Sequence, residues 1–464
     1  MKIILHNCWS EVYSANAEQI VYLKDLLTIN YHSFIRVKGR NKSVNRQYKL
    51  LDGNRIPTGI VPQMLSNTIM FGDTELEDKR QKPLKQDSMS PVVPFPTLWG
   101  HQSDAIIECM RLGRGIVEHA TGSGKTTTFA SLTCSLNVPT LVIVPNLDLL
   151  HQTKEVLVKY LGRSTVGAVG GSSIDLSKLI TVATTKKFAN HGCSSKFTPL
   201  RNYDMLILDE AHHVNLGHGG ASTLWYNIAL NINAYYRFGF TATPGRDGSP
   251  QRRLLQAATG RIIHSVGASQ LIKNDLLASV EVRVYDIDHG IKIDDWKTAH
   301  DTYILGEDRN RKIVELVNDE VKEGRSVLVI VDRVDLHGKI LHGLIPNSKF
   351  LHGGVDSEIR NDEMETFKLN GGILIGTIFG EGVDLPALDT VVNAAGGKSQ
   401  RLVTQRMGRA LRKDKNNPDK VARIIDFYDI DHGMLQGHAR TRLNVYESEP
   451  EFTVRRFDSI GGEA

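Results

Sequence analysis

Short apolar runs alternate with helical patterns along the chain from about residue 98 onward. Strands are predicted at residues 115–118, 140–144, 179–183 and 205–208, and the rhythm restarts with strands at residues 326–331, 373–376, 390–393 and 422–426. Because these runs are mainly apolar, they are typical of buried parallel strands that are joined by helices. The repetition predicts an α/β fold with two doubly wound parallel-sheet domains in tandem.

Residues 1–90 lack the signals found later and are interpreted as a small α+β domain in front of the other two. Within it, residues 33–38 and 46–51 flank a polar turn at residues 39–42, which predicts a β-hairpin. Polar, Lys-rich residues 75–90 are typical of a linker, and a proline-rich stretch that prevents regular structure follows.

The boundary between the two α/β domains is expected at residues 265–310, where the alternation is least clear. We therefore expect an accessory domain at residues 1–90, a first α/β domain at residues 91–275 and a second at residues 276–464.

Composition indicates a globular protein, because 41% of the 464 residues are hydrophobic and 23% are charged. No stretch approaches the roughly 20 apolar residues of a membrane span, and the N-terminus lacks the long apolar core of a signal peptide. We therefore expect a cytoplasmic protein that does not bind a membrane. The four cysteines are widely spaced, which argues against disulfides and against zinc.

The net charge of +4 is weak evidence for a nucleic-acid partner, whereas the distribution of charge is more informative. Between residues 36 and 55, seven Lys and Arg side chains accompany one acid, Asp52. The phosphate backbone of DNA would attract such a cluster. The candidate DNA contacts in the predicted hairpin are Arg36, Lys38, Arg40 and Lys42. A solvated surface hairpin is an equal alternative.

A glycine-rich loop follows the first predicted strand and precedes a helical run at residues 127–136. In a phosphate-binding loop of this kind, backbone N–H groups and the helix N-terminus face the phosphates. Lys125 would add positive charge, the Thr126 hydroxyl would bind Mg²⁺, and His119 replaces the first glycine of the general pattern. The candidate nucleotide-binding residues are Thr121, Gly122, Ser123, Gly124, Lys125 and Thr126.

Two adjacent carboxylates, Asp209 and Glu210, follow the predicted strand at residues 205–208. Ligands bind at the carboxyl ends of parallel strands. Asp209 is therefore expected to hold Mg²⁺ through water, and Glu210 to orient or deprotonate an attacking water. The alternative is that the two acids only stabilise a helix N-terminus.

Gly-Ser-Gly-Lys-Thr at residues 122–126 and Asp-Glu-Ala-His at residues 209–212 resemble motifs I and II of superfamily 2 helicases. Further segments follow in the order of that family. Residues 144–146 resemble motif Ia, and residues 184–185 resemble a strand-contact motif. Residues 241–244, 376–386 and 405–412 resemble motifs III, V and VI, respectively. The resemblance covers about residues 97–430 and implies two RecA-like domains that use ATP and Mg²⁺ to move along nucleic acid.

The resemblance also implies roles for single residues in the nucleotide site. Gln102 would recognise adenine, and Gly382 and Asp384 would contact the nucleotide. Arg409 and Arg412 would reach the γ-phosphate when the domains close. A physical argument supports these arginines independently, because they lie three apart on one helical face and a guanidinium fork suits phosphate oxygens.

Two further groups of residues have roles that the family alone implies. Coupling of the nucleotide site to the second domain and to the strand is implied for His212, Thr241, Thr243 and Gln405. Contact with the nucleic-acid strand is implied for Pro145, Thr184 and Thr377.

Within the superfamily, the chain most resembles the DNA helicases of tailed phages, because of its short domains, its small basic N-terminal domain and the Gln405 that begins motif VI. That group remodels branched DNA such as forks and four-way junctions. An RNA helicase with the same two domains is one alternative, since Asp-Glu-Ala-His also occurs there. A nucleic-acid-binding module with a decayed nucleotide site is another, and the intact Lys125, Asp209 and Glu210 argue against it.

Overall fold

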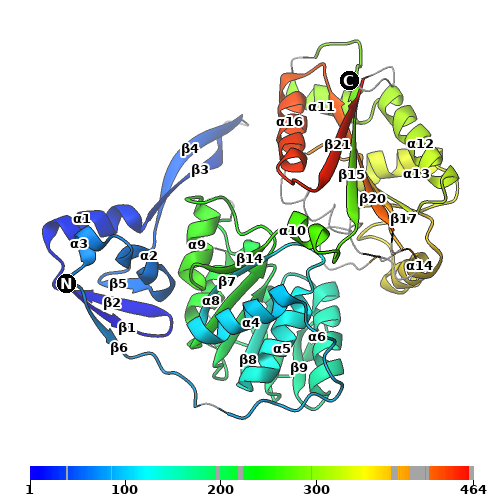
Figure 1. The fold of residues 1–464 in the computed structure, drawn as a ribbon. Coiled ribbons are helices and arrows are strands. Elements are labelled where there is room, and N and C mark those ends of the chain that lie inside the picture. Colours follow the sequence, from blue (N-terminus) through cyan, green and yellow to red (C-terminus); the bar gives the residue numbers. More distant parts are fainter. Residues whose placement is uncertain are drawn as a thin grey trace. The chain divides into compact units, whose positions relative to one another are not determined.

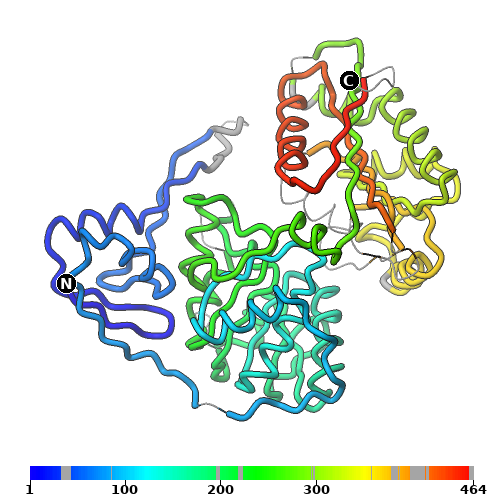
Figure 2. Tube along the Cα trace, viewed as in Figure 1, coloured from blue at the N-terminus to red at the C-terminus, as the bar shows by residue number. Residues whose placement is uncertain are grey.

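The structure is a computed structural model of the chain, and its contacts form two compact units. One unit comprises Met1–His119 and Gly124–Val266, and the other comprises Ala120–Ser123 and Gly267–Ala464. The description leaves out residues 38–39, 85, 195–198, 218–222, 294, 378–384, 386, 398–412, 414–416, 418 and 459–464, and also the side chains of residues 33–37, 40–42, 296–297 and 357. Figure 1 shows the helices and strands, and Figure 2 shows the course of the chain.

The first unit is built on an eight-stranded sheet with the order β10-β9-β11-β8-β12-β13-β7-β14. All neighbours in it pair in parallel except β9 and β10. The strands are β7 (Arg114–His119), β8 (Thr140–Val144), β9 (Val166–Gly170), β10 (Ser173–Ile174), β11 (Ile180–Thr184), β12 (Met205–Asp209), β13 (Tyr236–Thr241) and β14 (Ile262–Val266).

Alternate residues of these strands contribute to two separate hydrophobic clusters, one on each face of the sheet. In β8, for example, Leu141 and Ile143 belong to one cluster, and Val142 and Val144 belong to the other. Helices α4 (Gly100–Leu112), α5 (Lys125–Leu136) and α6 (Leu147–Leu161) pack on the face of Val142. Helices α7 (Thr185–His191), α8 (Leu224–Asn231) and α9 (Pro250–Ala258) pack on the face of Leu141. Burial on both faces explains why the central strands, such as β8 and β12, consist mainly of apolar residues.

The N-terminal part of this unit is a mixed α+β structure. Its four-stranded sheet has the order β5-β2-β1-β6, and β3 and β4 form a separate hairpin. The strands are β1 (Lys2–Leu5), β2 (Trp9–Tyr13), β3 (Thr28–Val37), β4 (Arg40–Lys49), β5 (Arg55–Pro57) and β6 (Glu75–Asp78). The helices are α1 (Ala17–Leu26), the 3₁₀ turn η1 (Thr58–Ile60), α2 (Val61–Leu65) and α3 (Thr68–Phe71).

The structure confirms the hairpin and corrects two details of the sequence interpretation. The turn is shorter than expected, because Val37 pairs with Arg40 and residues 40–42 belong to β4. The linker begins later than expected, because residues 75–78 form β6, which pairs in parallel with β1. A strand of Glu, Leu, Glu and Asp is polar enough to be mistaken for a linker, and it lies at the edge of its sheet.

The described residues of the segment between β6 and α4 form no helix or strand, and they bind to the surface of the first sheet domain. The Met89 N–H donates to the Cys134 carbonyl over 2.9 Å, and the Val92 N–H donates to the Tyr160 carbonyl over 2.7 Å. The Phe95 ring stacks on Tyr160 at 4.3 Å. Figure 2 shows the extended course of this segment.

The N-terminal part and the first sheet domain share one hydrophobic cluster, which is why they form one unit. A fully buried guanidinium reinforces the contact: Arg237 in β13 donates to the Ala258 carbonyl over 2.9 Å, to the Ile232 carbonyl over 2.6 Å and to the Cys8 sulfur over 3.1 Å. Arg114 donates to the Asn7 carbonyl over 2.7 Å.

The second unit contains a seven-stranded sheet, parallel throughout, with the order β17-β18-β16-β19-β20-β15-β21. Its strands are β15 (Ser279–Ile287), β16 (Val327–Ile330), β17 (Ser348–Leu351), β18 (Ile373–Gly376), β19 (Thr390–Asn393), β20 (Val421–Asp429) and β21 (Phe452–Phe457). Its described helices include α10 (Ala268–Lys273), α11 (Trp296–Ile304), α12 (Glu307–Lys322), the π-turn η5 (Val334–Gly338), α13 (Lys339–Leu344), α14 (Ser357–Asn370) and α16 (Gly433–Glu447).

The predicted fold class, with two parallel-sheet domains of the RecA type, is confirmed, and each of the eight predicted strands coincides with a strand of the structure. The division into three domains stays a prediction. Among the described residues, no helix is long and apolar enough to cross a membrane.

Glycine at position 59 is required where the 3₁₀ turn η1 meets α9. A Cβ on Gly59 would lie 2.1 Å from the Gln256 carbonyl oxygen and 2.9 Å from the Ala257 carbonyl oxygen. Gly59→Ala should therefore lower the free energy of unfolding by about 1–3 kcal/mol, measured by urea denaturation. Gly100→Ala is the control, since a Cβ there meets nothing within 4 Å. Equal stability of the two variants would contradict this close contact.

Candidate functional site

The carboxyl edge of the first sheet brings together residues from strands far apart in the sequence. The register places Asp209 at the end of β12 opposite Phe240 of β13, and Thr241 opposite Glu118 of β7. On the other side of β12, Thr184 of β11 lies opposite Val144 of β8. Most sequence-predicted site residues of the first domain therefore follow or end strands at one edge, where α/β sheets bind ligands.

The glycine loop at this edge connects the end of β7 to the first residue of α5, Lys125. Gly122 has a φ of 87° and Gly124 a φ of 77°, which L side chains rarely adopt. A Cβ on Gly124 would also lie 2.3 Å from the Gln102 Nε2 atom. The loop thus lies directly in front of a helix N-terminus, an arrangement that suits phosphate binding.

Lys125 and Thr126 occupy the first two positions of α5 and are partly buried. The Lys125 Nζ donates to the His119 carbonyl over 3.3 Å, which holds the ammonium group beside its own loop. An ammonium and a hydroxyl at the start of this helix suit a phosphate and its bound cation.

Gln102, at the third position of α4, is only 5% exposed and lies against the glycine loop. Its Oε1 accepts a hydrogen bond from the Trp99 N–H over 2.9 Å. The structure therefore places Gln102 beside the phosphate loop, and its recognition of adenine stays a prediction.

Asp209 is 3% exposed, and its Oδ1 accepts from the Glu210 N–H over 3.0 Å. Burial, followed by the neighbouring Glu210 carboxylate, raises the pKa of Asp209, and the positive charge of Lys125 opposes this rise. A buried carboxylate of this kind becomes stable in its ionised form when a cation lies beside it. Asp209 and the Thr126 hydroxyl offer oxygen atoms of the kind that Mg²⁺ prefers, and their joint binding of Mg²⁺ stays a prediction.

Glu210 has the left-handed backbone conformation, with φ and ψ both 50°. For a residue with a side chain, this conformation costs about 1–2 kcal/mol. Such conformations are concentrated at functional sites. The left-handed conformation of Glu210 turns the chain sharply after β12. The Glu210 Oε2 then lies 3.3 Å from the His212 Nδ1.

The buried His212 links this acid to the loop after β13. Its Nδ1 lies 3.1 Å from the Thr241 Oγ1, and this hydroxyl also accepts from the Thr243 N–H over 3.1 Å. The structure thus brings together three of the residues expected to couple the nucleotide site. The Gln251 Nε2 donates to the His212 carbonyl over 3.0 Å, a contact that no motif indicates.

A group of aromatic rings beside the phosphate loop was also not predicted. The His119 Nε2 lies 2.8 Å from the His264 Nδ1, and the rings of His101 and His119 are 5.2 Å apart. Burial lowers the pKa of His119 to about 2, so its ring adds no charge beside Lys125. The only signal in the sequence was the replacement of the usual first glycine by His119.

The expected nucleic-acid contacts are spread over several elements. Pro145 follows β8 and Thr184 ends the adjacent β11, so both lie at the carboxyl edge of the first sheet. Thr377 follows β18 in the second unit. Arg36, Arg40 and Lys42 lie in the hairpin strands, but their side chains are outside the description.

Six predicted residues lie outside the described residues altogether. They are Lys38, Gly382, Asp384, Gln405, Arg409 and Arg412.

Comparisons with known families match both sheet domains. Residues 97–246 match the family described as "Type III restriction enzyme, res subunit", and residues 308–414 match "Helicase conserved C-terminal domain". The first match includes the glycine loop, the two carboxylates and Thr241, and the second includes Thr377.

Two named relatives extend over most of the chain. The "DNA 3'-5' translocase XPB2" of Sulfurisphaera tokodaii is 27% identical over 74% of this chain and 85% of its own. The "ATP-dependent DNA helicase uvsW" of Enterobacteria phage T4 is 26% identical over 82% of this chain and 81% of its own. In fold, the chain is similar to a fragment of a putative HsdR subunit of a type I restriction enzyme from Vibrio vulnificus. That likeness has a TM-score of 0.62 at 16% identity and covers 97% of this chain and 83% of the other.

The hydroxyl of Thr241 contacts both the His212 ring and the Thr243 N–H. Thr241→Val keeps the size of the side chain but removes the acceptor of the Thr243 N–H, so unfolding should require about 1–3 kcal/mol less free energy. Thr259→Val is the matched control, because its buried hydroxyl bonds only to the Leu255 carbonyl, which already accepts the Thr259 N–H. Urea denaturation of both variants measures the difference, and a smaller decrease for Thr241→Val than for Thr259→Val would contradict the shared role.

Proposed function

Because the chain belongs to helicase superfamily 2, we propose that it hydrolyses ATP to move along DNA and to remodel branched DNA, such as forks and four-way junctions. The observation that best supports ATP hydrolysis is the burial of Asp209 at the same sheet edge as the glycine loop. The positive charge of Lys125 lowers the otherwise raised pKa of this carboxyl group. A decayed nucleotide site would have no reason to keep a carboxylate pair desolvated in this way, since burial of unneeded charge destabilises a protein.

The chemistry follows from the positions of these side chains. Backbone N–H groups of residues 122–126 and the Lys125 ammonium bind the β- and γ-phosphates of ATP. Thr126 and Asp209 would hold Mg²⁺, which supplies positive charge to the phosphates. Glu210 orients the attacking water and accepts its proton, and the strained backbone fixes the direction of this carboxylate. Arg409 and Arg412 remain proposed contacts of the γ-phosphate.

Coupling between hydrolysis and movement is proposed to begin at His212. A change in the Glu210 carboxylate during hydrolysis alters its contact with His212, and the Thr241 hydroxyl transmits this change to the backbone of Thr243. Thr241 and Thr243 therefore act as positioning residues, and Gln405 is proposed as their counterpart in the second unit.

Three features support DNA as the polymer. Both relatives named above carry DNA in their names. Pro145 and Thr184 offer a backbone edge and a hydroxyl at neighbouring strand ends, which suits contact with phosphates rather than bases. The basic hairpin has a firmly held base, because the Arg253 guanidinium donates to the Thr28 carbonyl over 3.2 Å and the Tyr48 ring packs edge-on against Tyr226 at 6.2 Å.

Removing the proposed general base tests the hydrolytic site. Glu210→Gln should still bind ATP, but its turnover should fall by about 10²- to 10⁴-fold because the amide cannot accept the proton. Steady-state ATPase rates and binding of a fluorescent ATP analogue measure the two properties. Glu155→Gln, an exposed change on α6, is the control. A Glu210→Gln rate within about threefold of the parent would remove Glu210 from this role.

Neutralising the hairpin tests its part in DNA binding. Replacement of Arg36, Lys38, Arg40 and Lys42 by Ser should weaken binding to forks and reduce the salt slope by about 0.9 for each phosphate that the variant no longer binds. ATPase activity at saturating single-stranded DNA should survive, because its residues lie in the sheet domains. The control removes four exposed cations of the second unit, with Arg311, Lys322, Lys339 and Lys349 changed to Ser. Equal effects of the two sets would show that the hairpin is an ordinary solvated surface.

A further inference from the structure

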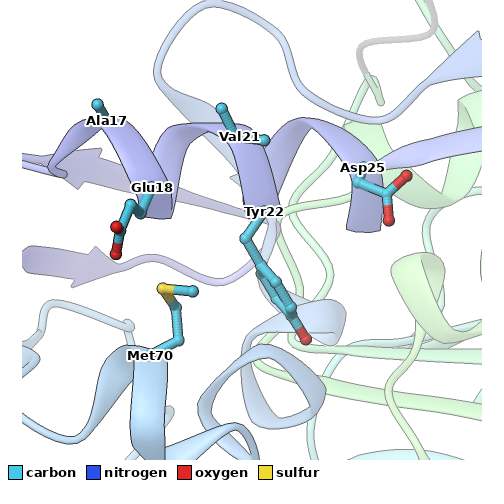
Figure 3. A pocket seen from close by; sticks show the side chains of 6 residues that line it. All are labelled: Ala17, Glu18, Val21, Tyr22, Asp25 and Met70. Carbon is cyan, nitrogen blue, oxygen red and sulfur yellow. The ribbon is translucent and has the colours of Figure 1, made fainter.

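An apolar groove of about 590 Å³ lies between α1 and α3 of the N-terminal domain, away from the residues assigned above. Figure 3 shows the side chains that line it, with Val21 and Tyr22 on α1 and the Met70 thioether on α3. The lining is completed by Ala17, Glu18 and Asp25.

The walls of the groove are held in place by contacts behind it. The Gln19 Nε2 donates to the Met70 carbonyl over 2.9 Å, which ties α1 to α3. The Tyr22 ring packs edge-on against Phe71 at 5.4 Å. The Asn16 side chain caps α1 and the Asn67 side chain caps α3. A partner would therefore find the groove already formed, and little free energy would be needed to order it.

One apolar residue that lines the groove is exposed, and so are two apolar residues that precede lining residues in the sequence. Val21 is 67% exposed, and Ile69, which precedes Met70, is 99% exposed. Ile20, which precedes Val21, is 41% exposed. Apolar side chains that gather at a groove in this way mark an interaction surface more often than scattered single ones do.

The charge of the groove specifies its partner further. Its charged lining residues are two carboxylates, Glu18 and Asp25, and Lys24 of the same helix is not among the lining residues. These carboxylates would repel DNA phosphates, in contrast to the basic hairpin that follows α1. They are seven residues apart on one helix, which corresponds to about 10.5 Å along its axis.

We propose that this groove docks an amphipathic helix of a partner protein. The partner inserts apolar side chains between Val21, Tyr22 and Met70, and it places Lys or Arg residues opposite Glu18 and Asp25. Cations at positions i and i+7 of a helix that runs along α1 have the matching separation. Since α1 leads through Leu27 into β3, such a partner would bind at the base of the hairpin. The groove would thus recruit a second protein to the DNA-binding domain.

Two synthetic peptides test this proposal with the full-length protein. Both are acetylated, amidated, Ala-rich helices with two central Leu residues. One has Lys at positions i and i+7, and the other has Glu there. Fluorescence anisotropy should give a Kd below about 1 mM for the Lys peptide and at least about tenfold weaker binding for the Glu peptide.

Variants of the groove should change this preference without affecting the fold, because their side chains are exposed. Glu18→Lys with Asp25→Lys should reverse the preference between the peptides, and Val21→Ser should weaken both. The matched control, Asp308→Lys with Asp319→Lys on α12, should bind as the parent does. DNA-stimulated ATPase activity should be the same in every variant, which separates this proposal from the proposed function.

Three results would overturn the proposal. The first is the absence of binding by the Lys peptide at about 1 mM, and the second is an unchanged preference in the charge-reversed variant. The third is a parent protein that is dimeric by analytical ultracentrifugation and becomes monomeric in Val21→Ser, because the groove would then bind a second copy of this chain.

Discussion

Two adjacent carboxylates at the end of a buried strand can remain ionised only if positive charge lies beside them. Asp209 is desolvated and next to Glu210, and the charge that opposes its raised pKa comes from Lys125, at the start of the helix after the glycine loop. The left-handed turn at Glu210 and the buried His212 follow directly along the chain. The glycine loop, the proposed Mg²⁺ ligands and the contacts toward Thr241 therefore all lie where this one electrostatic constraint acts, at the carboxyl edge of the first sheet.

The sequence predicted the buried parallel strands well because burial on both faces favours continuous apolar runs, as in β8 and β16. It missed β15, where Glu281 and Arg283 alternate with buried valines and bond to each other over 3.0 Å. It also missed β13, because a buried arginine is not expected in a core strand. Arg237 is tolerated there because backbone carbonyls accept its hydrogen bonds, which no local pattern reveals.

Contacts between distant parts of the chain could not be predicted at the candidate site either. The local residue patterns predicted the glycine loop and the two acids, and the family resemblance implied the link between His212 and Thr241. It could not predict Gln251 or the contact between His119 and His264, because these depend on which strands are neighbours in the sheet. The arginines of motif VI, Arg409 and Arg412, lie outside the described residues, so their role still rests on the resemblance and on the suitability of a guanidinium fork for phosphate oxygens.

The N-terminal part of the first unit carries two surfaces with different chemistry. Its core is continuous with that of the first sheet domain, and Arg237 and Arg114 bond across the contact. One surface is the hairpin, whose sequence is basic, and the other is the groove, whose charged lining residues are acidic. A duplex and a protein partner could thus be bound side by side without competing for the same charges.

The most direct test of the central claim is the ATPase rate of the full-length protein at one fixed salt concentration, with different nucleic acids as stimulators. Forks, four-way junctions, linear duplex, single-stranded DNA and RNA of matched length should be compared. We expect DNA to stimulate ATP hydrolysis, with forks and junctions effective at lower concentrations than linear duplex. Stimulation by RNA but by none of the DNA substrates, or a rate of ATP hydrolysis that no nucleic acid changes, would contradict the proposed function.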